Sequence, residues 1–348
     1  MKVAELSQER LAEFATRFQR ARIAVLGDFF LDRYLDVDPA LEELSVETGE
    51  PAHQVVGVRC RPGAAGTVVS NLVALGAGRV HAVGFTGADG EGYELRQALA
   101  ALSCTTTHLH EVATRRTPTY LKPRDAGVAT LAGEHSRYDT KNRSPTPSEV
   151  QEQVLRSVET LLNEVDALVV VDQVEADGGV VPARVRGGLA DWAKRFPHVV
   201  FWADSREHVR EYRGVLIKPN QFEATGVENR PGAEVTLDVL QAAVARLRVQ
   251  NGAAVAATRG ALGMLVTDPE WTLVPGVVVA GDVDPTGAGD SATAGAVLAL
   301  CAGAELPEAC VVANIVASIT VEQIGTTGVA HVEQLPERLE LWGEQQQA

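Results

Sequence analysis

The chain has 348 residues and a formal net charge of −15, with 45% hydrophobic and 22% charged residues. This length allows one large domain or two unequal ones around a sizeable buried core. The acidic balance argues against a general nucleic-acid surface and against binding to anionic membranes. It does not exclude a phosphate ligand, because a few local cations and helix amides suffice to bind one.

Nothing in the sequence predicts export or a membrane span. The four cysteines show no CxxC spacing and read as reduced thiols rather than as disulfides or a zinc site. The first 20 residues are amphipathic and charged, without the apolar region of a signal peptide. No run of about 18 apolar residues occurs. We therefore expect a cytoplasmic protein with no membrane and no nucleic-acid partner.

The first 140 residues combine regular elements with two irregular stretches. Helices are expected over 6–18, 65–75 and 93–102, and strands over 22–27 and 80–85. The irregular stretches, about 33–61 and 105–140, look β-like, and 119–122 is one candidate strand. They predict a small separate β-sheet, a lid, that projects from the main body.

After Pro147 apolar strands alternate regularly with helices. Strands are expected over 167–171, 199–203, 215–217, 253–257, 264–266 and 271–274. Helices are expected up to 162, over 180–196 and 237–249, and from 288 and 307 onwards. This alternation predicts βαβ units and a mostly parallel sheet covered by helices on both faces. We expect residues 1–348 to form a single α/β domain with its lid.

The most informative segment is Asp284-Pro285-Thr286-Gly287-Ala288-Gly289-Asp290, which places a glycine-rich turn directly before a helix. The first N–H groups of a helix have no intrahelical partner and favour a bound anion. Asp290 would repel a phosphate, but it suits the removal of a proton from a hydroxyl that attacks one. The alternative is a plain loop in which Thr286 caps the helix and Asp290 complements its dipole.

Four further segments are ambiguous when each is taken alone. Asp32 follows the first strand, where α/β sheets bind ligands, but solvated carboxylates are common there. The small residues of 61–67 allow either close approach of a ligand or tight packing. Asn220 and Glu223 suit a hydrated Mg²⁺, or a helix cap. Residues 258–263 border a nucleotide or form an ordinary turn.

The order of these segments along the chain resembles the ribokinase-like (PfkB) carbohydrate kinases over about residues 22–335. The residues that carry the resemblance are Gly27, Asp28, Asp32, 62–66, 220–223, 258–263 and 284–290. Within the family the chain looks most like the heptose-phosphate kinases that form one half of a bifunctional enzyme, the other half being an adenylyltransferase. The cues for this closer resemblance are 27–34, 45–47, Thr119, Lys122, Arg124 and 137–139.

This resemblance implies a three-layer ribokinase-like fold, with a mostly parallel central sheet between helices and a β lid that often forms a dimer interface. It implies ATP and Mg²⁺, sometimes with a monovalent cation such as K⁺, and a sugar or sugar phosphate as substrate. By position, Asp290 is the catalytic base. The amides of Gly287, Ala288 and Gly289 form the anion hole.

The resemblance also assigns roles to the remaining positions. The sugar is expected to contact Asp32, Gly63, Ala64 and Thr67, and the lid residues Lys122, Arg124 and Arg137 to meet a substrate phosphate. Asn220 and Glu223 organise Mg²⁺ and the phosphates. The nucleotide site is lined by Asn220, Thr258, Gly260, Gly263 and Asn314, and Asp284 is the candidate ligand of a monovalent cation.

The chain departs from the family pattern at several positions. Thr67 stands where the family usually has a sugar-contacting asparagine, and Pro285 where it more often has threonine or valine. Residues 172–178 replace the heptose-kinase pattern Asp-Tyr-x-Lys-Gly and lack its lysine, and no adenylyltransferase segment occurs. These departures leave a non-catalytic sugar or nucleotide sensor as the alternative to a kinase, although a sensor has no use for Asp290 as a base.

Overall fold

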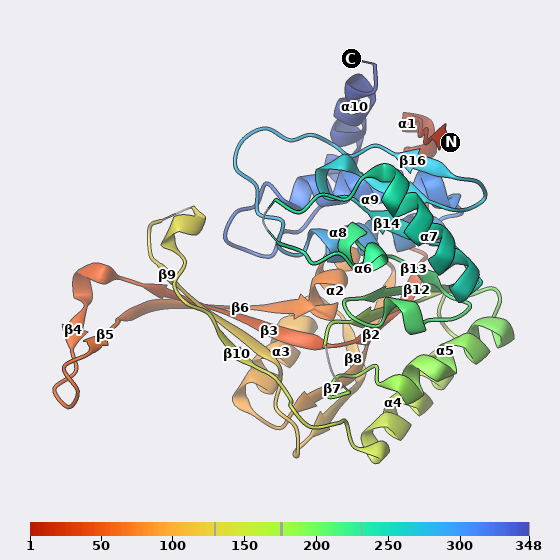
Figure 1. The fold of residues 1–348 in the computed structure, drawn as a ribbon. Coiled ribbons are helices and arrows are strands. Elements are labelled where there is room, and N and C mark those ends of the chain that lie inside the picture. Colours follow the sequence, from red (N-terminus) through yellow and green to blue (C-terminus); the bar gives the residue numbers. More distant parts are fainter. Residues whose placement is uncertain (129, 175–176, 231, 348) are drawn as a thin grey trace.

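The computed structural model describes residues 1–128, 130–174, 177–230 and 232–347, and it has a parallel sheet between two layers of helices (Figure 1). The main sheet has the strand order β13-β12-β11-β2-β7-β8, and all its neighbouring strands are parallel. Its strands are β2 (Arg22–Gly27), β7 (Arg79–Gly87), β8 (Thr105–Val112), β11 (Ala167–Asp172), β12 (Val200–Ser205) and β13 (Leu216–Ile217). The predicted three-layer α/β fold is confirmed.

A second sheet, with the order β1-β16-β15-β14, extends the first one. It consists of β1 (Lys2–Val3), β14 (Ala256–Thr258), β15 (Met264–Val266) and β16 (Thr272–Val274). Two parallel bridges, Ile217 to Val255 and Asn220 to Thr258, join its β14 edge to the β13 end of the main sheet. The second bridge brings two predicted nucleotide-site residues side by side.

Helices cover both faces of the main sheet because its strands are apolar on both sides. In β2, Ile23 and Val25 join one buried cluster, while Ala24 and Leu26 join the other. The first cluster includes residues of α1 (Gln8–Phe18), α2 (Ala65–Ala74), α3 (Gly90–Ala101), α8 (Ala288–Cys301), α9 (Leu306–Thr320) and α10 (Leu335–Gln345). The second includes residues of α4 (Ser148–Leu161), α5 (Ala183–Arg195), α6 (Gln221–Thr225) and α7 (Leu237–Asn251).

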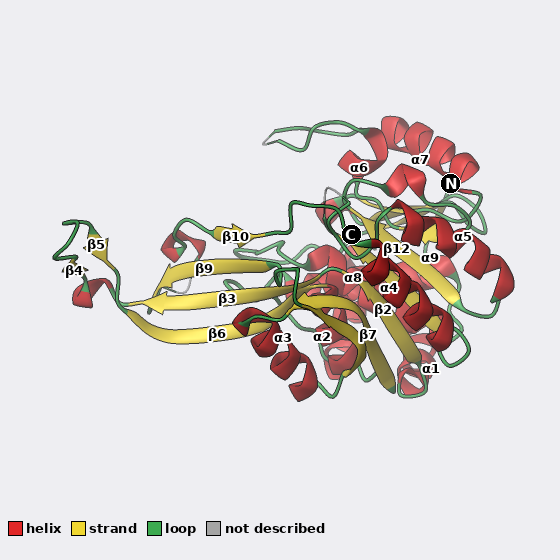
Figure 2. Cartoon of the chain, turned by 90° about the horizontal axis from the view of Figure 1, so that it is seen from below, coloured by secondary structure: helices red, strands yellow, loops and turns green. Residues whose placement is uncertain are grey.

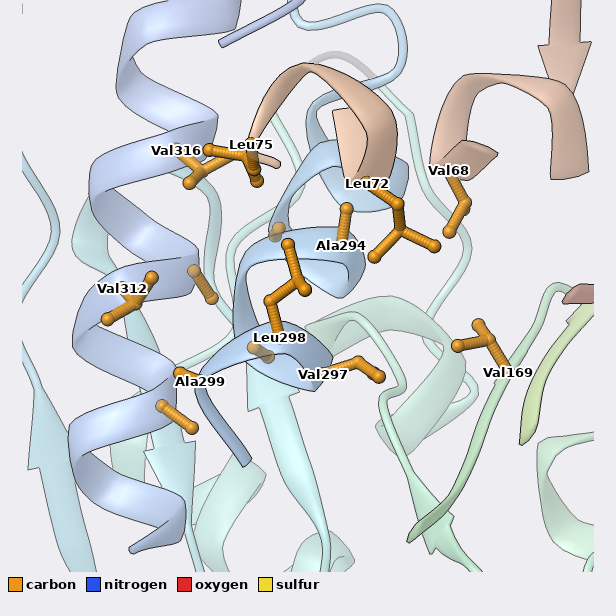
Figure 3. Packing of buried hydrophobic residues seen from close by; sticks show 14 of the residues in the cluster. Val68, Leu72, Leu75, Val169, Ala294, Val297, Leu298, Ala299, Val312 and Val316 are labelled. Atoms are coloured by element: carbon orange, nitrogen blue, oxygen red, sulfur yellow. The ribbon is translucent and has the colours of Figure 1, made fainter. Parts of the chain in front are cut away.

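Helix α8 lies in the middle of the first helical layer, between α2 and α9 (Figure 3). Its residues from Ser291 to Ala299 are all buried. A Cβ at Gly295 would lie 2.9 Å from Cγ2 of Val316 on α9, so glycine is needed for this close approach. Packing on two sides therefore fixes the helix whose first turn carries Asp290.

The lid is a separate sheet with the order β10-β9-β3-β6, which extends away from the body (Figures 1 and 2). Its strands are β3 (Phe29–Val37), β6 (Val55–Ala64), β9 (Thr119–Asp125) and β10 (Tyr138–Thr140), and its tip carries the hairpin of β4 (Glu43–Leu44) and β5 (Pro51–Ala52). Only Asp28 separates β3 from the central strand β2. The first residues of β3 therefore lie at the junction of lid and body.

The structure differs from the predicted lid range at one end. Residues Thr105–Val112 form β8, which pairs with β7 at the edge of the main sheet and so belongs to the body. Of its residues only Leu109 is buried. An edge strand that is covered so sparsely has the mixed polar pattern of a lid strand, which explains the wrong prediction.

Other elements differ in extent or were not foreseen. The helix expected over 180–196 begins at Ala183, because Pro182 occupies the N-cap. No pattern predicted β1 or α10. Short 3₁₀ helices occupy Pro39–Leu41, Leu131–Gly133, Val209–Glu211, Gly260–Leu262 and Val332–Gln334. Within the described ranges, no helix has both the length and the apolar character required to cross a membrane.

Candidate active site

A cleft of about 1000 Å³ opens next to the carboxyl ends of β11 and β12 and the first turn of α8. Eight residues predicted from the sequence line it together: Asn220, Glu223, Thr258, Gly260, Gly287, Ala288, Gly289 and Asp290. Three charged residues that no sequence pattern assigned to the site, Asp204, Arg206 and Lys218, line it as well. The cleft lies where open α/β sheets generally bind ligands.

The first turn of α8 presents backbone N–H groups to this cleft. Gly287 is the N-cap residue and has a φ of 78°, a conformation that favours glycine. The N–H of Ala288 donates to the carbonyl of Pro285 at 3.1 Å. In the described structure, no hydrogen-bond partner accepts from the N–H groups of Gly287, Gly289 or Asp290. An anion at this position would therefore meet these three groups, and Ala288 contributes less than the sequence suggested.

Asp290 lies in an environment that opposes its ionisation. It is partly buried, and desolvation together with the charge of Asp204 raises its pKa to about 8, while Lys218 and Arg206 act in the opposite direction. The charge of the Asp32 carboxylate on the lid strand also contributes to this rise in pKa. A carboxylate with a pKa near neutrality suits proton abstraction better than an ordinary surface aspartate does.

Lys218 is a buried ammonium beneath the glycine-rich turn. It is 3% exposed, and its Nζ lies 2.7 Å from Oδ2 of Asp204. A Cβ at Gly289 would lie 3.4 Å from this Nζ. Thr293 of α8 donates a further hydrogen bond to Asp204, at 3.3 Å. These contacts of Asp204 therefore hold the Lys218 ammonium close to the N-terminus of α8.

Asn220 and Glu223 form the capping box of α6, as the simpler interpretation of their spacing predicted. The Asn220 side-chain oxygen accepts from the N–H groups of Phe222 and Glu223, both at 2.9 Å, and the Glu223 carboxylate accepts from the N–H of Asn220 at 2.7 Å. Both residues nevertheless line the cleft. Burial and the charge of Asp204 raise the pKa of Glu223 to about 7. Because the capping box uses the Asn220 side-chain oxygen and only one Glu223 oxygen, the other Glu223 oxygen is better placed than Asn220 to meet a hydrated cation.

Asp32 has one oxygen occupied and one bare. Its Oδ2 accepts from the Thr327 hydroxyl at 3.0 Å and lies 3.1 Å from Nζ of Lys122. Its Oδ1 is buried and has no partner within the part of the chain that the structure describes. A buried acceptor without a donor costs stability unless a ligand supplies the donor. The site therefore suits one hydroxyl group at Oδ1.

The other predicted sugar-site residues surround this carboxylate and the α8 turn. A Cβ at Gly63 would lie 2.9 Å from the Asp32 carboxyl carbon. Ala64 adopts a φ of 52°, which is unfavourable for a residue with a side chain. The methyl group of Thr67 would lie 3.2 Å from a Cβ at Gly287. Close packing thus favours glycine at positions 63 and 287. Thr67 presents a methyl group towards the turn.

The three lid cations are placed differently from one another. Lys122 contacts Asp32, whereas Arg137 pairs with Asp139 at 2.7 and 2.9 Å and stacks over the Tyr120 ring at 4.3 Å. Arg124 is buried, and it donates to the carbonyl groups of Gly325 and Val128. Arg124 therefore braces the lid against the body instead of offering its charge to a substrate, contrary to the role expected from the sequence.

The loop 325–330 connects the lid, α2 and the α8 turn. It contacts the lid through Arg124 and Asp32, and α2 through Asn71, whose side chain bonds Gly328 and Ala330. Asp284 accepts from the N–H groups of Thr286 at 3.0 Å and of Gly325 at 3.3 Å. These bonds partly satisfy the carboxylate, and binding of a monovalent cation there stays a prediction.

Two predicted nucleotide-site residues support the backbone behind the cleft instead of lining it. The Asn314 amide donates to the carbonyls of Val274 and Pro275 at 3.2 and 2.9 Å. Gly263 has a φ of 85°, and a Cβ there would collide with the Val274 carbonyl at 2.1 Å. Both shape the turn beside Gly260.

The segment 172–178, which departs from the heptose-kinase pattern, is described except for residues 175 and 176. The Asp172 carboxylate is buried and accepts from Ser205 at 2.8 Å, Tyr212 at 3.0 Å and His208 at 3.1 Å. Asp172 therefore anchors the loop after β12 and does not face the cleft, whereas Gln173 does.

Metal binding would depend on the substrate. Over the described ranges, no group of three or more His, Cys, Asp or Glu side chains is arranged to hold a metal ion. Mg²⁺ in phosphoryl-transfer sites usually retains water and is held by one or two carboxylates together with substrate phosphates. Glu223 and Asp204 beside the α8 turn fit that arrangement.

Comparison with known proteins identifies the family. Residues 20–332 match the sequence profile of the pfkB family carbohydrate kinases. The chain belongs to this family. The resemblance inferred from the motif order is therefore confirmed.

Curated relatives of this family member are bifunctional proteins, in agreement with the closer resemblance seen in its sequence. It is 31% identical to Bifunctional protein HldE of Shewanella baltica over 319 residues, which are 91% of this chain and 63% of that protein. It is also 31% identical to Bifunctional protein HldE of Caulobacter vibrioides over 332 residues, 93% of this chain and 65% of that protein. The chain thus spans less than two thirds of the length of the first of these relatives.

Solved structures show the same fold at lower identity. Phosphofructokinase-2 from Escherichia coli superposes with a TM-score of 0.69 at 17% identity, covering 93% of this chain and 99% of that one. Ribokinase from Thermotoga maritima superposes with a TM-score of 0.64 at 20% identity, covering 92% and 99%. At these identities the likeness establishes the ribokinase-like fold alone.

Several residues of the carbohydrate kinase site carried no signal that could be read from sequence. Thr327 reaches Asp32 across 295 residues of chain, and Asp204 meets Lys218 only because two parallel strands end side by side. The Lys218-Pro219-Asn220 segment gave a weak hint through its position after a strand. Single polar residues at strand ends are too common for such a hint to identify a site.

Proposed function

We propose that the protein transfers the terminal phosphoryl group of ATP to a hydroxyl of a sugar or sugar phosphate, with Asp290 as the base. The observation that carries this proposal is the position of Asp290: it lies in the first turn of α8, in the cleft lined by Glu223 and Lys218, and beside N–H groups that have no partner among the described residues. The family membership supports the same reaction.

In this reaction Asp290 takes the proton of the acceptor hydroxyl. The hydroxyl oxygen forms a bond to the terminal phosphorus while the bond from that phosphorus to the ADP oxygen breaks, so ADP leaves. General base catalysis of this kind contributes about 10²–10⁴-fold to a rate. Positioning and charge stabilisation supply most of the remainder in phosphoryl transfer.

Charge stabilisation comes from the groups around the α8 turn. The N–H groups of Gly287 and Gly289 have no partner among the described residues and would donate to the transferred group, while the α8 dipole adds a positive potential there. Lys218 lies next to this turn, although Asp204 compensates most of its charge. Glu223 would help to hold Mg²⁺, which would neutralise charge on the donor phosphates.

Asp32 would orient the acceptor sugar through its bare oxygen. Lys122 and Arg137, which surround Tyr120 on the lid, would favour an acceptor that already carries a phosphate. A heptose phosphate is the specific substrate that we propose, since the closest sequence cues are those of heptose-phosphate kinases. Thr67 in place of asparagine removes one polar contact with such a sugar.

We further propose a homodimer formed through the lids, in the cytoplasm. Strand β6 is an edge of the lid sheet and leaves Val56 and Val58 about half exposed, at 55% and 50%. Unpaired edges with apolar side chains favour association. The four cysteines are free thiols, as expected in a reducing compartment.

The decisive experiment measures sugar-dependent ADP release by the wild type and by Asp290→Asn, across sugars and sugar phosphates. Asparagine keeps the shape of the side chain but cannot accept the proton, so we expect turnover to fall about 10²–10⁴-fold. Asp238→Asn is the matched control, because Asp238 is an exposed aspartate in the first turn of another helix. This control should keep wild-type turnover.

Near-wild-type turnover of Asp290→Asn would remove the role of Asp290 as base. A wild type that binds sugars or nucleotide, as seen by a rise in melting temperature, but releases no ADP with any sugar would instead support the sensor. The observation that supports this second function is that Thr67 presents a methyl group to the α8 turn.

A further inference from the structure

Arg206 is a cation of the cleft that the proposed reaction has not yet used. It directly follows β12, and its N–H donates to the carbonyl of Asp172 at 3.1 Å. The preceding residue, Ser205, is buried, and its hydroxyl donates to the Asp172 carboxylate at 2.8 Å. The backbone of Arg206 is therefore fixed at the carboxyl edge of the sheet, whereas its side chain is exposed in the cleft.

The guanidinium faces groups from three different elements. Its charge lowers the pKa of Asp290 in α8, of Glu223 in α6 and of Tyr120 on the lid strand β9. Asp290 and Glu223 line the same cleft as Arg206, and Tyr120 stacks on Phe30 near the base of the lid. Arg206 thus lines the cleft together with Asp290 and Glu223, and its charge also acts on Tyr120 of the lid.

Arg206 also differs from the other cations that line the cleft. Lys218 is paired with Asp204 at 2.7 Å, and Arg210 donates to the carbonyl of Ala224 at 3.1 Å. The Arg206 side chain makes no hydrogen bond or ion pair with the residues that the structure describes. All five of its N–H donors are therefore available to a ligand.

The charge balance of the cleft requires such a group. A donor phosphate arriving at the α8 turn meets the carboxylates of Asp204, Glu223 and Asp290, and Asp204 already compensates Lys218. The dipole of α8 supplies only about half a positive charge. A planar guanidinium that binds two phosphate oxygens at once is the side chain best suited to offset the remaining repulsion.

We infer that Arg206 is a catalytic residue that binds the oxygens of the phosphoryl group as it passes from the nucleotide to the acceptor hydroxyl. This inference rests on the kinase reaction proposed above. The Arg206 charge does not change during the step: Asp290 holds the acceptor proton, and the negative charge that develops on the transferred group is shared with the guanidinium. Lid closure over Tyr120 would exclude water from this contact and strengthen it.

The test uses Arg206→Ala and Arg206→Lys in the full-length protein. We expect Arg206→Ala to lower kcat about 10²–10³-fold, the range typical of losing one group that stabilises transition-state charge, with little change in the KM for sugar. Arg206→Lys should be intermediate, because lysine keeps the charge but loses the two-pronged geometry. Arg195→Ala, which removes an exposed arginine that pairs with Glu159 on α4, is the control and should match the wild type.

Two further readouts separate this role from a structural one. The acid limb of the kcat/KM profile reports the ionisation of Asp290, which also faces Asp204, Lys218 and Asp32. It should move to higher pH in Arg206→Ala and stay in place in Arg206→Lys. A second readout is the melting temperature in the presence of Mg²⁺. A non-hydrolysable ATP analogue should raise the melting temperature more than ADP does, and this difference measures the contact with the terminal phosphate. The difference should be smaller in Arg206→Ala than in the wild type.

Wild-type kcat in Arg206→Ala, or an unchanged difference between the ATP analogue and ADP, would overturn the inference. If the wild type released no ADP with any sugar, the proposed function would fail, while the melting experiment would still decide whether Arg206 contacts the terminal phosphate. Should Arg206→Ala not fold, Arg206→Gln replaces it in all three measurements.

Discussion

At the scale of single residues, the site depends on charges that oppose one another. Burial and the charges of Asp204 and Asp32 raise the pKa of Asp290, whereas the charges of Lys218 and Arg206 lower it. Two other acids of the site have a neutralising partner: Lys218 pairs with Asp204 and Lys122 with Asp32. Asp290 has no such dedicated partner among the described residues, and this allows it to exchange a proton.

The first prediction concerns the pH dependence of activity and stability. With a pKa of about 8 for Asp290, kcat/KM should fall about tenfold per pH unit below that value, because only the ionised form is a base. Between the ordinary pKa of 3.8 and about 8, the folded protein retains a proton that the unfolded chain releases. The free energy of unfolding should therefore decrease as pH rises through this window.

Asp290→Asn provides the check, since asparagine does not titrate. The melting temperature of the variant minus that of the wild type should grow with pH up to about 8 and then level off. A difference that stays constant from pH 5 to pH 9 would show that Asp290 has an ordinary pKa.

At the scale of elements, close packing between helices positions the first turn of α8. Leu72 of α2 and Val316 of α9 lie on opposite sides of α8 (Figure 3). The contact with α9 tolerates no side chain at Gly295, where a Cβ would lie 2.9 Å from Val316 Cγ2 and 3.2 Å from the Val312 carbonyl. Glycine is unfavourable inside a helix, so the close packing against α9, and not helix propensity, explains the glycine at position 295.

Two glycine-to-alanine variants test this balance. Gly295→Ala should lower the free energy of unfolding by about 1–3 kcal/mol, because the β-branched Val316 cannot move away without strain. Gly187→Ala on α5 is the matched control, since a Cβ there meets nothing within 4 Å. Its stability should rise by about 0.5–1 kcal/mol through helix propensity alone. Chemical denaturation of both variants checks this, and equal effects would contradict the packing argument.

At the scale of the whole molecule, the lid is a separate sheet that extends from the body (Figure 2). It is attached through the continuous chain from β2 to β3 and through Arg124, which reaches Gly325 of the body. Its edge strand β6 exposes Val56 and Val58. A sheet of this kind gains stability by covering its edge with a second copy.

We therefore predict that the protein elutes as a dimer in size-exclusion chromatography with light scattering. Val58→Asp should shift it to the monomer, because a charge at the centre of the interface would be buried without a partner. Val249→Asp is the control: Val249 is 85% exposed on α7, outside the lid. A wild type that is monomeric at all concentrations, or a Val58→Asp protein that remains dimeric, would rule out the lid interface.

Local patterns along the chain determined the fold class and part of the site. Strand β2 begins and ends where the apolar run 22–27 does, and the glycine-rich turn before α8 was readable because the chemistry of a helix start lies in consecutive residues. By contrast, the sequence pattern of β8 wrongly predicts a lid strand, because a sparsely covered edge strand shows no clear alternation of apolar and polar residues. Arg124 was expected at the substrate, because its residue type does not reveal that Gly325 accepts its hydrogen bond.

The sequence by itself determined the order of the elements, the turn at 284–290 and the identity of its aspartate, because periodicity and turn chemistry act over a few residues. Only the tertiary structure decided which charges surround that aspartate. The Asp204 and Lys218 pair, the bond from Thr327 to Asp32 and the open guanidinium of Arg206 all arise where strand ends and loops far apart in the chain converge. Electrostatic interactions depend on distance in space, which the local pattern does not encode.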